Sequence, residues 1–212
     1  MKLGGSSYTP PDAGKHRMRL VSIIDVGTHP PSNPKYRAKQ QIRLGYILPD
    51  VLEEIEDNGV TKKEPKTYSE IFGATLWSNK GLTKLGKRIK GTTGRDPQTD
   101  PAAQDTSNWI GVDLEAHFAP NEDDEIVLTS AKRVAPFTDV PKSETFEFYW
   151  KDQETTEDAL EALGSLSEGM VKWLCKANEF KALPGTVVSL DVRDPDPDIP
   201  GTEYQDGADV PF

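Results

Sequence analysis

Alternating apolar and polar positions mark five segments of this chain as strands. Residues 16–27, HRMRLVSIIDVG, alternate before becoming continuously apolar, and residues 40–48, QQIRLGYIL, alternate throughout. Residues 66–77, 109–118 and 125–134 have the same character, and a short polar turn joins the last two. A period of two residues is typical of strands, because it places alternate side chains on opposite faces of a sheet. The pattern therefore predicts five strands.

Helical spacing appears in two other segments. Residues 79–91, NKGLTKLGKRIKG, place Leu82, Leu85 and Ile89 at three- and four-residue steps, with basic residues mainly around the other face. We expect a short basic amphipathic helix here, despite its glycines. Residues 158–180 repeat apolar positions at the same steps. They predict a C-terminal helix that docks by its apolar face.

The segments between these elements are rich in Pro, Gly, Asn and acidic residues, which favour loops. Residues 28–39 predict a long loop, residues 49–65 an acidic connector, and residues 91–108 a loop before the fourth strand. Five strands with a helix between the third and the fourth is the order of an OB-fold barrel, in which a groove receives oligonucleotides. We therefore expect a mainly β fold built on a five-stranded OB barrel.

Composition divides the chain into four parts. We expect a flexible N-terminal arm at residues 1–14, the barrel at 15–136, a connector with the docked helix at 137–189, and an acidic tail at 190–212. The tail alternates Asp, Pro and Gly, and has too little apolar surface to offset its ordering entropy. We therefore expect the tail to be disordered until a partner binds it.

The formal net charge of −10 is unevenly distributed along the chain. Residues 191–212 hold seven acids and one base, which gives −6. Residues 1–48 hold eight bases against two acids, and residues 79–95 hold six bases without an acid, so each segment carries +6. Uncompensated cations repel one another, and an anionic partner relieves that repulsion. These two basic islands predict such a partner, and a solvated charged face is the alternative.

Nucleic acid is the anion that also explains the aromatic residues within the basic islands. Cations follow phosphates, and flat rings stack on unpaired bases. Tyr36 lies in a loop between Lys35 and Arg37, where a ring has little structural purpose, whereas the strand aromatics and Trp109 could equally fill the barrel core. The candidate DNA-binding residues are Arg17, Arg19, Lys35, Tyr36, Arg37, Lys39, Arg43, Tyr46, Tyr68, Phe72, Trp77, Lys80, Lys84, Lys87, Arg88 and Lys90.

Signals for catalysis are poor. The three histidines lack metal-ligand spacing, and no phosphate-binding glycine loop or nucleophile motif is present. Cys175 is the single cysteine and falls on the apolar C-terminal helix, where a buried inert thiol is the expected state. The sequence also shows no apolar run long enough to cross a bilayer. We therefore expect a soluble protein of a reducing compartment, with no catalytic residues, no cofactor and no bound metal.

A barrel with basic grooves and a flexible acidic tail closing on Pro-Phe resembles the single-stranded DNA-binding proteins of bacteria and their phages. In that family the tail ends in acids followed by Ile-Pro-Phe, and this chain has DGADVPF. The segments AGKHRMRLVSIIDVGTH and KQQIRLGYIL resemble the first two strands of the phage branch. The segment TYSEIFGATLWSNKGLTKLGKRIKG resembles its third strand and helix, and LSEGMVKWLCKANEF its short helix near the tail.

The resemblance implies a protein of the bacterial host cytoplasm that coats single-stranded DNA with little sequence preference during phage replication, recombination and repair. It also implies that the tail recruits replication proteins. The partner-binding residues would be Asp206, Asp209, Val210, Pro211 and Phe212. Two alternatives remain open. One is a strand-annealing or recombination factor on the same barrel, and the other is a viral interaction protein whose basic islands contact an acidic protein.

Overall fold

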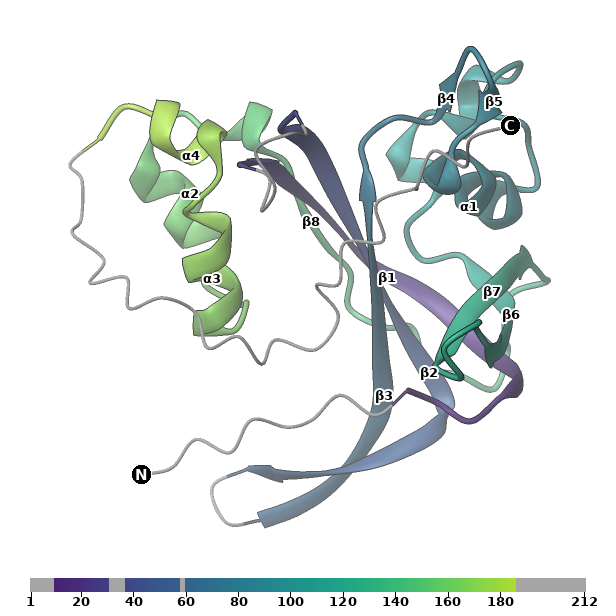
Figure 1. Ribbon diagram of the computed structural model, residues 1–212. Helices are drawn as coiled ribbons and strands as arrows, with labels where there is room; N and C mark the ends of the chain where they lie inside the picture. The colour runs from purple at the N-terminus through teal and green to yellow at the C-terminus, as the bar shows by residue number, and fades with distance from the viewer. Residues whose placement is uncertain (1–9, 31–36, 58–59, 186–212) are drawn as a thin grey trace.

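One sheet organises the chain in the computed structural model, which describes residues 10–30, 37–57 and 60–185 (Figure 1). Its strands lie in the order β3-β2-β1-β6-β7, and each neighbouring pair is antiparallel, while β8 runs parallel to β1. The strands are β1 (Gly14–His29), β2 (Lys39–Asp57), β3 (Val60–Gly73), β6 (Asp113–Pro120), β7 (Ile126–Arg133) and β8 (Phe146–Phe148). The fold is mainly β, and the strand pairing leaves the sheet open between β3 and β7.

The apolar run in β1 is explained by two cores, one on each face of this strand. Met18, Leu20 and Ile23 belong to the first core, which the strands and α1 (Lys84–Thr93) enclose. Ile24 and Val26 belong to a second core on the other side. A register shift between Leu20 and Ser22 interrupts the pairing with β2. A strand buried on both faces reads as continuously apolar, as this one does.

Helix α1 packs against the sheet through its glycines. A Cβ atom at Gly86 would overlap the carbonyl oxygen of Leu76, and one at Gly91 would overlap that of Ala131 in β7. Thr83 caps the helix, because its side-chain oxygen accepts a hydrogen bond from the Gly86 amide at 3.1 Å. The basic helix expected at 79–91 is therefore present, but it begins at Lys84 and ends at Thr93. Its glycines permit close packing.

Short elements connect α1 to its neighbours. Before the helix lies a small hairpin of β4 (Trp77–Ser78) and β5 (Gly81–Leu82). After it come two 3-10 turns, η1 (Pro101–Ala103) and η2 (Thr106–Asn108). The next residue, Trp109, is buried in the first core, and its indole nitrogen donates to the Ala103 carbonyl at 2.8 Å. The fourth expected strand thus begins at Asp113 instead of at residue 109.

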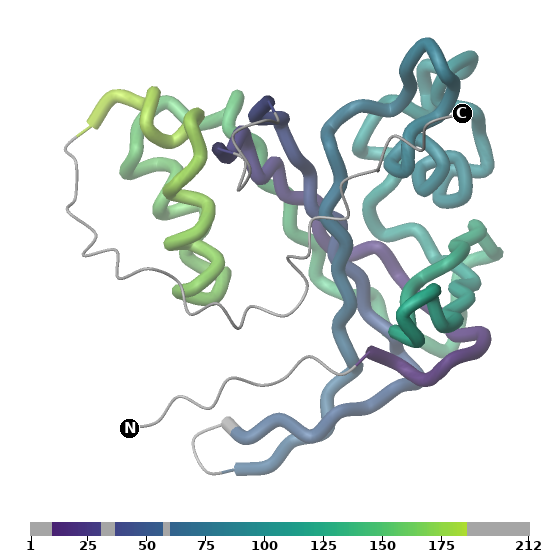
Figure 2. The backbone as a smooth tube through the Cα atoms, viewed as in Figure 1, coloured from purple at the N-terminus to yellow at the C-terminus, as the bar shows by residue number. Residues whose placement is uncertain are grey.

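The prediction of an acidic connector at residues 49–65 is wrong. These residues continue β2 and β3 as a two-stranded ribbon, paired from Leu52 with Pro65 to Asp57 with Val60. We call residues 49–57 and 60–66 the β2–β3 arm. Figure 2 shows its two strands running together away from the rest of the chain. The arm is polar in composition, since little of it is buried, and its backbone pairs regularly from Leu52 to Asp57, beyond a register shift at residues 49–51.

The single C-terminal helix expected at 158–180 is replaced by three short helices. These are α2 (Thr156–Ala162), α3 (Glu168–Leu174) and α4 (Asn178–Ala182), preceded by a 3-10 turn, η3 (Trp150–Asp152). Together with β8 they cover the second face of β1. Helix α4 is tied to that strand by Glu179, whose carboxylate accepts from the Thr28 amide at 2.6 Å and the Thr28 hydroxyl at 2.7 Å.

Candidate nucleic-acid interface

Antiparallel pairing brings two separate basic segments to one end of the sheet. The start of β2 lies beside the end of β3, where Gln41 pairs with Gly73 and the Ala74 amide donates to the Gln40 carbonyl at 2.9 Å. Arg37 and Lys39 are exposed at this end of β2. The chain leaving β3 there leads within a few residues to Trp77, whose side chain is 37% exposed. Cations and an open ring therefore meet at this end.

The turn between β4 and β5 supplies the cation Lys80, and the first half of α1 supplies Lys84 and Lys87, which the helix itself does not favour. Lys80, Lys84 and Lys87 are exposed, and none of them forms an ion pair with another described residue. The first turn of α1 contains no acid. Because a helix N-terminus carries partial positive charge, lysines there are unfavourable for helix stability, whereas an anion is stabilised. The arrangement suits a phosphate partner.

Arg43 supplies a further cation on the outward face of β2. Its neighbours Ile42 and Leu44 point into the first core, so strand alternation places Lys39, Gln41 and Arg43 on the opposite face. The guanidinium is half-buried, burial lowers the pKa of Arg43, and no carboxylate pairs with it among the described residues. A partly desolvated arginine without a counterion is a good contact for phosphate.

Three expected contact residues are buried, which corrects their assignment. Arg19 is held by Asp113 in a buried ion pair, and its guanidinium also donates to the Pro141 carbonyl at 2.6 Å. Arg88 points away from solvent and donates to Glu70 at 2.8 Å and to the Leu128 carbonyl at 3.1 Å. Tyr46 is 1% exposed within the first core and cannot stack on a base. These side chains stabilise the fold.

Other candidates are occupied by partners within the protein. Arg17 is bound by Asp50 and by Asp139, the latter at 2.7 Å, and Lys90 is bound by Asp96 at 2.8 Å. Sequence reasoning missed these carboxylates because most lie far away in the chain. A second group faces inward, since Tyr68 and Phe72 pack against the first core. The ring of Tyr68 meets Phe118 edge-on, with centroids 5.1 Å apart.

Some predicted residues lie outside the described part of the chain. They are Lys35, Tyr36, Asp206, Asp209, Val210, Pro211 and Phe212. Their assignments remain sequence-based predictions.

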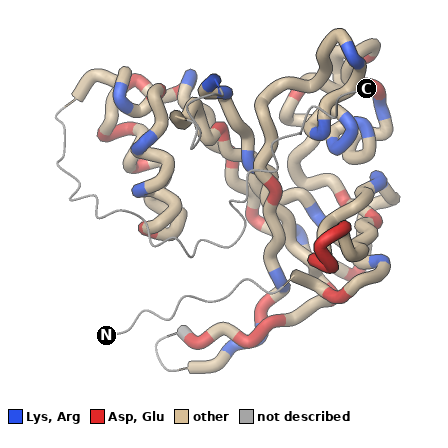
Figure 3. The backbone as a smooth tube through the Cα atoms, in the orientation of Figure 1, with Lys and Arg blue, Asp and Glu red and all other residues tan. Residues whose placement is uncertain are grey.

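Charge is segregated across the molecule (Figure 3). Lys and Arg gather around α1 and the β4–β5 hairpin, whereas Asp and Glu gather on the β2–β3 arm and at the turn between β6 and β7. That turn contains Glu122, Asp123, Asp124 and Glu125. Carboxylates at the basic end pair with Lys90 and Arg95, and the separation leaves Lys80, Lys84 and Lys87 to attract an anion.

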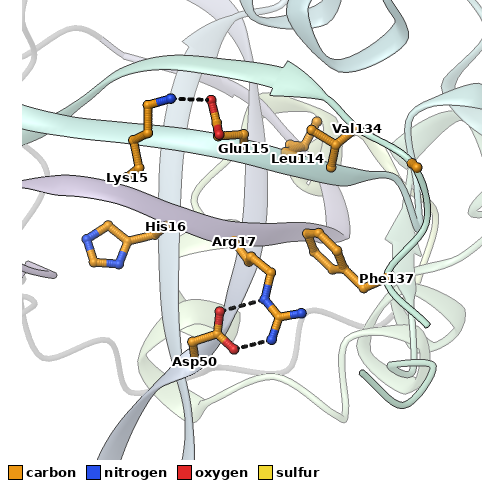
Figure 4. Close-up of a pocket in the computed structure, with 9 residues that line it drawn as sticks. Lys15, His16, Arg17, Asp50, Leu114, Glu115, Val134 and Phe137 are labelled. Atoms are coloured by element: carbon orange, nitrogen blue, oxygen red, sulfur yellow. Dashed lines mark hydrogen bonds and ion pairs between the residues drawn. The ribbon is translucent and has the colours of Figure 1, made fainter. Parts of the chain in front are cut away.

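A surface pocket of about 470 Å³ lies elsewhere, where β1 separates from β2 (Figure 4). Its apolar wall comes from Leu114, Val134 and Phe137. Its cations are neutralised, because Lys15 pairs with Glu115 at 3.0 Å and Arg17 with Asp50. This pocket is therefore a poor phosphate site compared with the α1 end of the sheet.

No family model, curated protein or solved structure matches this chain. The described residues include no group of three or more His, Cys, Asp and Glu side chains placed to hold a metal ion. Within the same ranges, no helix has both the length and the apolar character needed to cross a membrane.

Proposed function

We propose that this protein binds single-stranded DNA at the end of the sheet formed by the start of β2, the β4–β5 hairpin and α1. The observation that carries the proposal is the gathering of cations without internal counterions around an exposed ring. Lys80, Lys84 and Lys87 supply the cations near Trp77, which supplies the ring, and Arg43 supplies a further cation on the other face of β2. Phosphates would meet the cations, and an unpaired base would stack on the indole.

The strand order also supports this proposal. β1, β2, β3, β6 and β7, with α1 between the third and the fourth, follow the order of an OB barrel. The two strands that would close such a barrel are β3 and β7. Arg88 spans them, because it donates to Glu70 in β3 and to the Leu128 carbonyl in β7. We propose that this is an OB barrel whose last seam is bridged by a side chain.

Little sequence preference is expected at this site. Lysine ammonium groups recognise phosphate as a point charge, and every base offers a ring face for stacking. Duplex DNA should bind more weakly, since its bases are already stacked. The protein would accordingly coat exposed single strands during replication or recombination.

The test is a fluorescence titration with labelled oligothymidylate and a labelled duplex. Changing Lys84 and Lys87 together to Ala should weaken single-strand binding about tenfold, because two phosphate contacts are lost. Trp77→Ala should weaken it by a similar factor through lost stacking. The matched control changes Lys62 and Lys63 in the arm to Ala, which removes the same charge from the opposite end. Equal effects of the two lysine pairs would contradict the proposed site.

We also propose that residues 206–212 recruit a partner protein. This part of the proposal is supported by the sequence alone. Asp206 and Asp209 precede the apolar residues Val210, Pro211 and Phe212. Acids steer a peptide to a basic surface, and an aromatic ring anchors it in an apolar recess. Phe212→Ala should therefore abolish capture of a replication protein while leaving the oligothymidylate titration unchanged. Capture at the wild-type level would remove this part of the proposal.

A further inference from the structure

The β2–β3 arm leaves one side of β2 without a strand neighbour. β1 pairs with β2 only as far as Ile47, while β2 continues to Asp57 and pairs there with β3 alone. Among the described residues, no backbone hydrogen bond other than the β3 ladder involves residues 49–57. The outward N–H and C=O groups of this stretch are therefore available to another strand.

The two edges of the arm differ in a way that singles out β2. The β3 edge carries Lys62, Lys63 and Pro65, and both lysine and proline protect an edge strand against further pairing. The β2 edge has neither residue type between Val51 and Glu56. Its exposed side chains include Leu52, at 57% exposure, and Ile55, at 38%. An edge with exposed apolar side chains, and with neither lysine nor proline between Val51 and Glu56, is suited to the addition of a strand that neutralises its acids.

Charge indicates what kind of strand fits. Asp50, Glu53, Glu54 and Glu56 lie along this edge, and no Lys or Arg lies between them. Two of these acids form ion pairs with lysines of β3. Glu53 pairs with Lys66 and Glu54 with Lys63, each at 3.7 Å. The Lys63–Glu54 pair is exposed and contributes little, whereas the Lys66 side chain is mostly buried. An incoming strand would be favoured by basic side chains at this edge.

The pocket of Figure 4 lies at the base of the same edge. Asp50 of β2 and Arg17 of β1 line it, and their ion pair crosses the gap where the two strands separate. Leu114, Val134 and Phe137 form its apolar wall. A peptide following β2 toward the body would bring a side chain to this pocket. In strand addition the backbone gives affinity, and such pockets give specificity.

We propose that the free edge of β2 in the arm is a docking site for an extended basic peptide of a partner protein, added as a strand beside residues 50–56. Lysine or arginine side chains on one face of the peptide meet Glu54 and Glu56, which share a face of β2, and side chains on its other face lie beside Glu53 and Ile55. An apolar side chain near one end enters the pocket beside Phe137. This site is separate from the DNA interface and does not depend on it.

The test uses the full-length protein and a fluorescein-labelled peptide in which lysine alternates with valine, followed by fluorescence anisotropy. The alternating peptide should bind. A second peptide with proline at alternate positions should bind at least about tenfold more weakly, because proline removes ladder donors. An acidic peptide, glutamate alternating with valine, should not bind. Changing Glu53, Glu54 and Glu56 together to Lys should reverse the charge preference.

Hydrogen exchange provides a second readout that does not rely on the triple variant folding. Adding the alternating peptide to the wild-type protein should slow exchange of amides within residues 50–56. Equal binding of the proline peptide would show a charge attraction without strand addition and would overturn the proposal, as would unchanged exchange. An oligothymidylate titration of the triple variant keeps the two sites distinct, since its DNA affinity should not fall.

Discussion

At the scale of single residues, a cation's role is decided by the carboxylates that face it. Arg17 and Arg19 lie in β1, and Arg43 lies in the neighbouring β2. Arg17 is bound by Asp50 and Asp139, and Arg19 is bound by Asp113. Arg43 is bound by no described residue. The sequence predicts that basic residues gather in these segments. It does not reveal which of them are neutralised, because Asp113 and Asp139 lie about a hundred residues away.

Arg88 and Glu70 give a prediction about stability and pH. Burial raises the pKa of Glu70 even beside Arg88. Arg88→Met would leave this carboxylate buried without its cation, which should lower the free energy of unfolding by about 3–5 kcal/mol at pH 8. A raised folded-state pKa means that the folded chain holds the proton more tightly, so the variant should regain stability as the pH falls.

Urea unfolding of the wild type and the variant at pH 5.5 and pH 8 measures the loss of unfolding free energy at each pH. Both pH values lie roughly within the range where most folds are stable. Glu70→Gln combined with Arg88→Met is the control, because it removes the titrating group. A loss that is equal at both pH values in Arg88→Met alone would contradict the assignment to Glu70.

At the scale of elements, periodicity located the strands at 16–27, 40–48 and 125–134 and the basic helix. It failed for the arm, because its residues are exposed on both faces and do not alternate in hydrophobicity. There the backbone ladder with β3 forms the strand, and side-chain burial contributes little. It also missed β8, whose three residues are too few to show a period. The C-terminal segment has helical spacing, but Ala177 is extended and separates α3 from α4.

Gly91 in α1 offers a test of the helix packing. In an isolated helix, Ala is favoured over Gly by about 1 kcal/mol. Here a Cβ atom would overlap the Ala131 carbonyl oxygen, so Gly91→Ala should instead destabilise the protein by about 1–3 kcal/mol. Gly73→Ala is the matched control, since nothing lies within 4 Å of its Cβ position. Thermal denaturation of both variants checks the sign, and a stabilised Gly91→Ala would refute the close contact.

At the scale of the whole molecule, separated charge makes the proposed DNA binding sensitive to salt. If Lys80, Lys84, Lys87 and Arg43 each neutralise one phosphate, log affinity should fall against log salt with a slope of about −2.8. Affinity for oligothymidylate should then drop roughly fiftyfold between about 50 and 200 mM salt. Titrations at several salt concentrations measure the slope, and a flat dependence would argue against phosphate contacts.

The second core ties the C-terminal helices to the sheet. The barrel expected at residues 15–136 therefore packs against residues that lie outside those bounds. A chain ending at residue 136 lacks Phe148, Trp150 and Leu163, which pack with Ile24 and Val26. Such a fragment should bind the dye ANS and unfold at lower urea concentration than the full chain, because apolar surface of β1 is uncovered. Equal unfolding midpoints and no dye binding would show that the barrel stands alone.

The shared strand also sets an order of events during translation. β1 leaves the ribosome first, but the residues that cover its second face are synthesised more than a hundred positions later. Throughout that interval Ile24 and Val26 are accessible to any other apolar surface in the cell, including a neighbouring nascent chain. The interval between the synthesis of β1 and that of the C-terminal helices is therefore the period in which we expect this protein to depend most on chaperones.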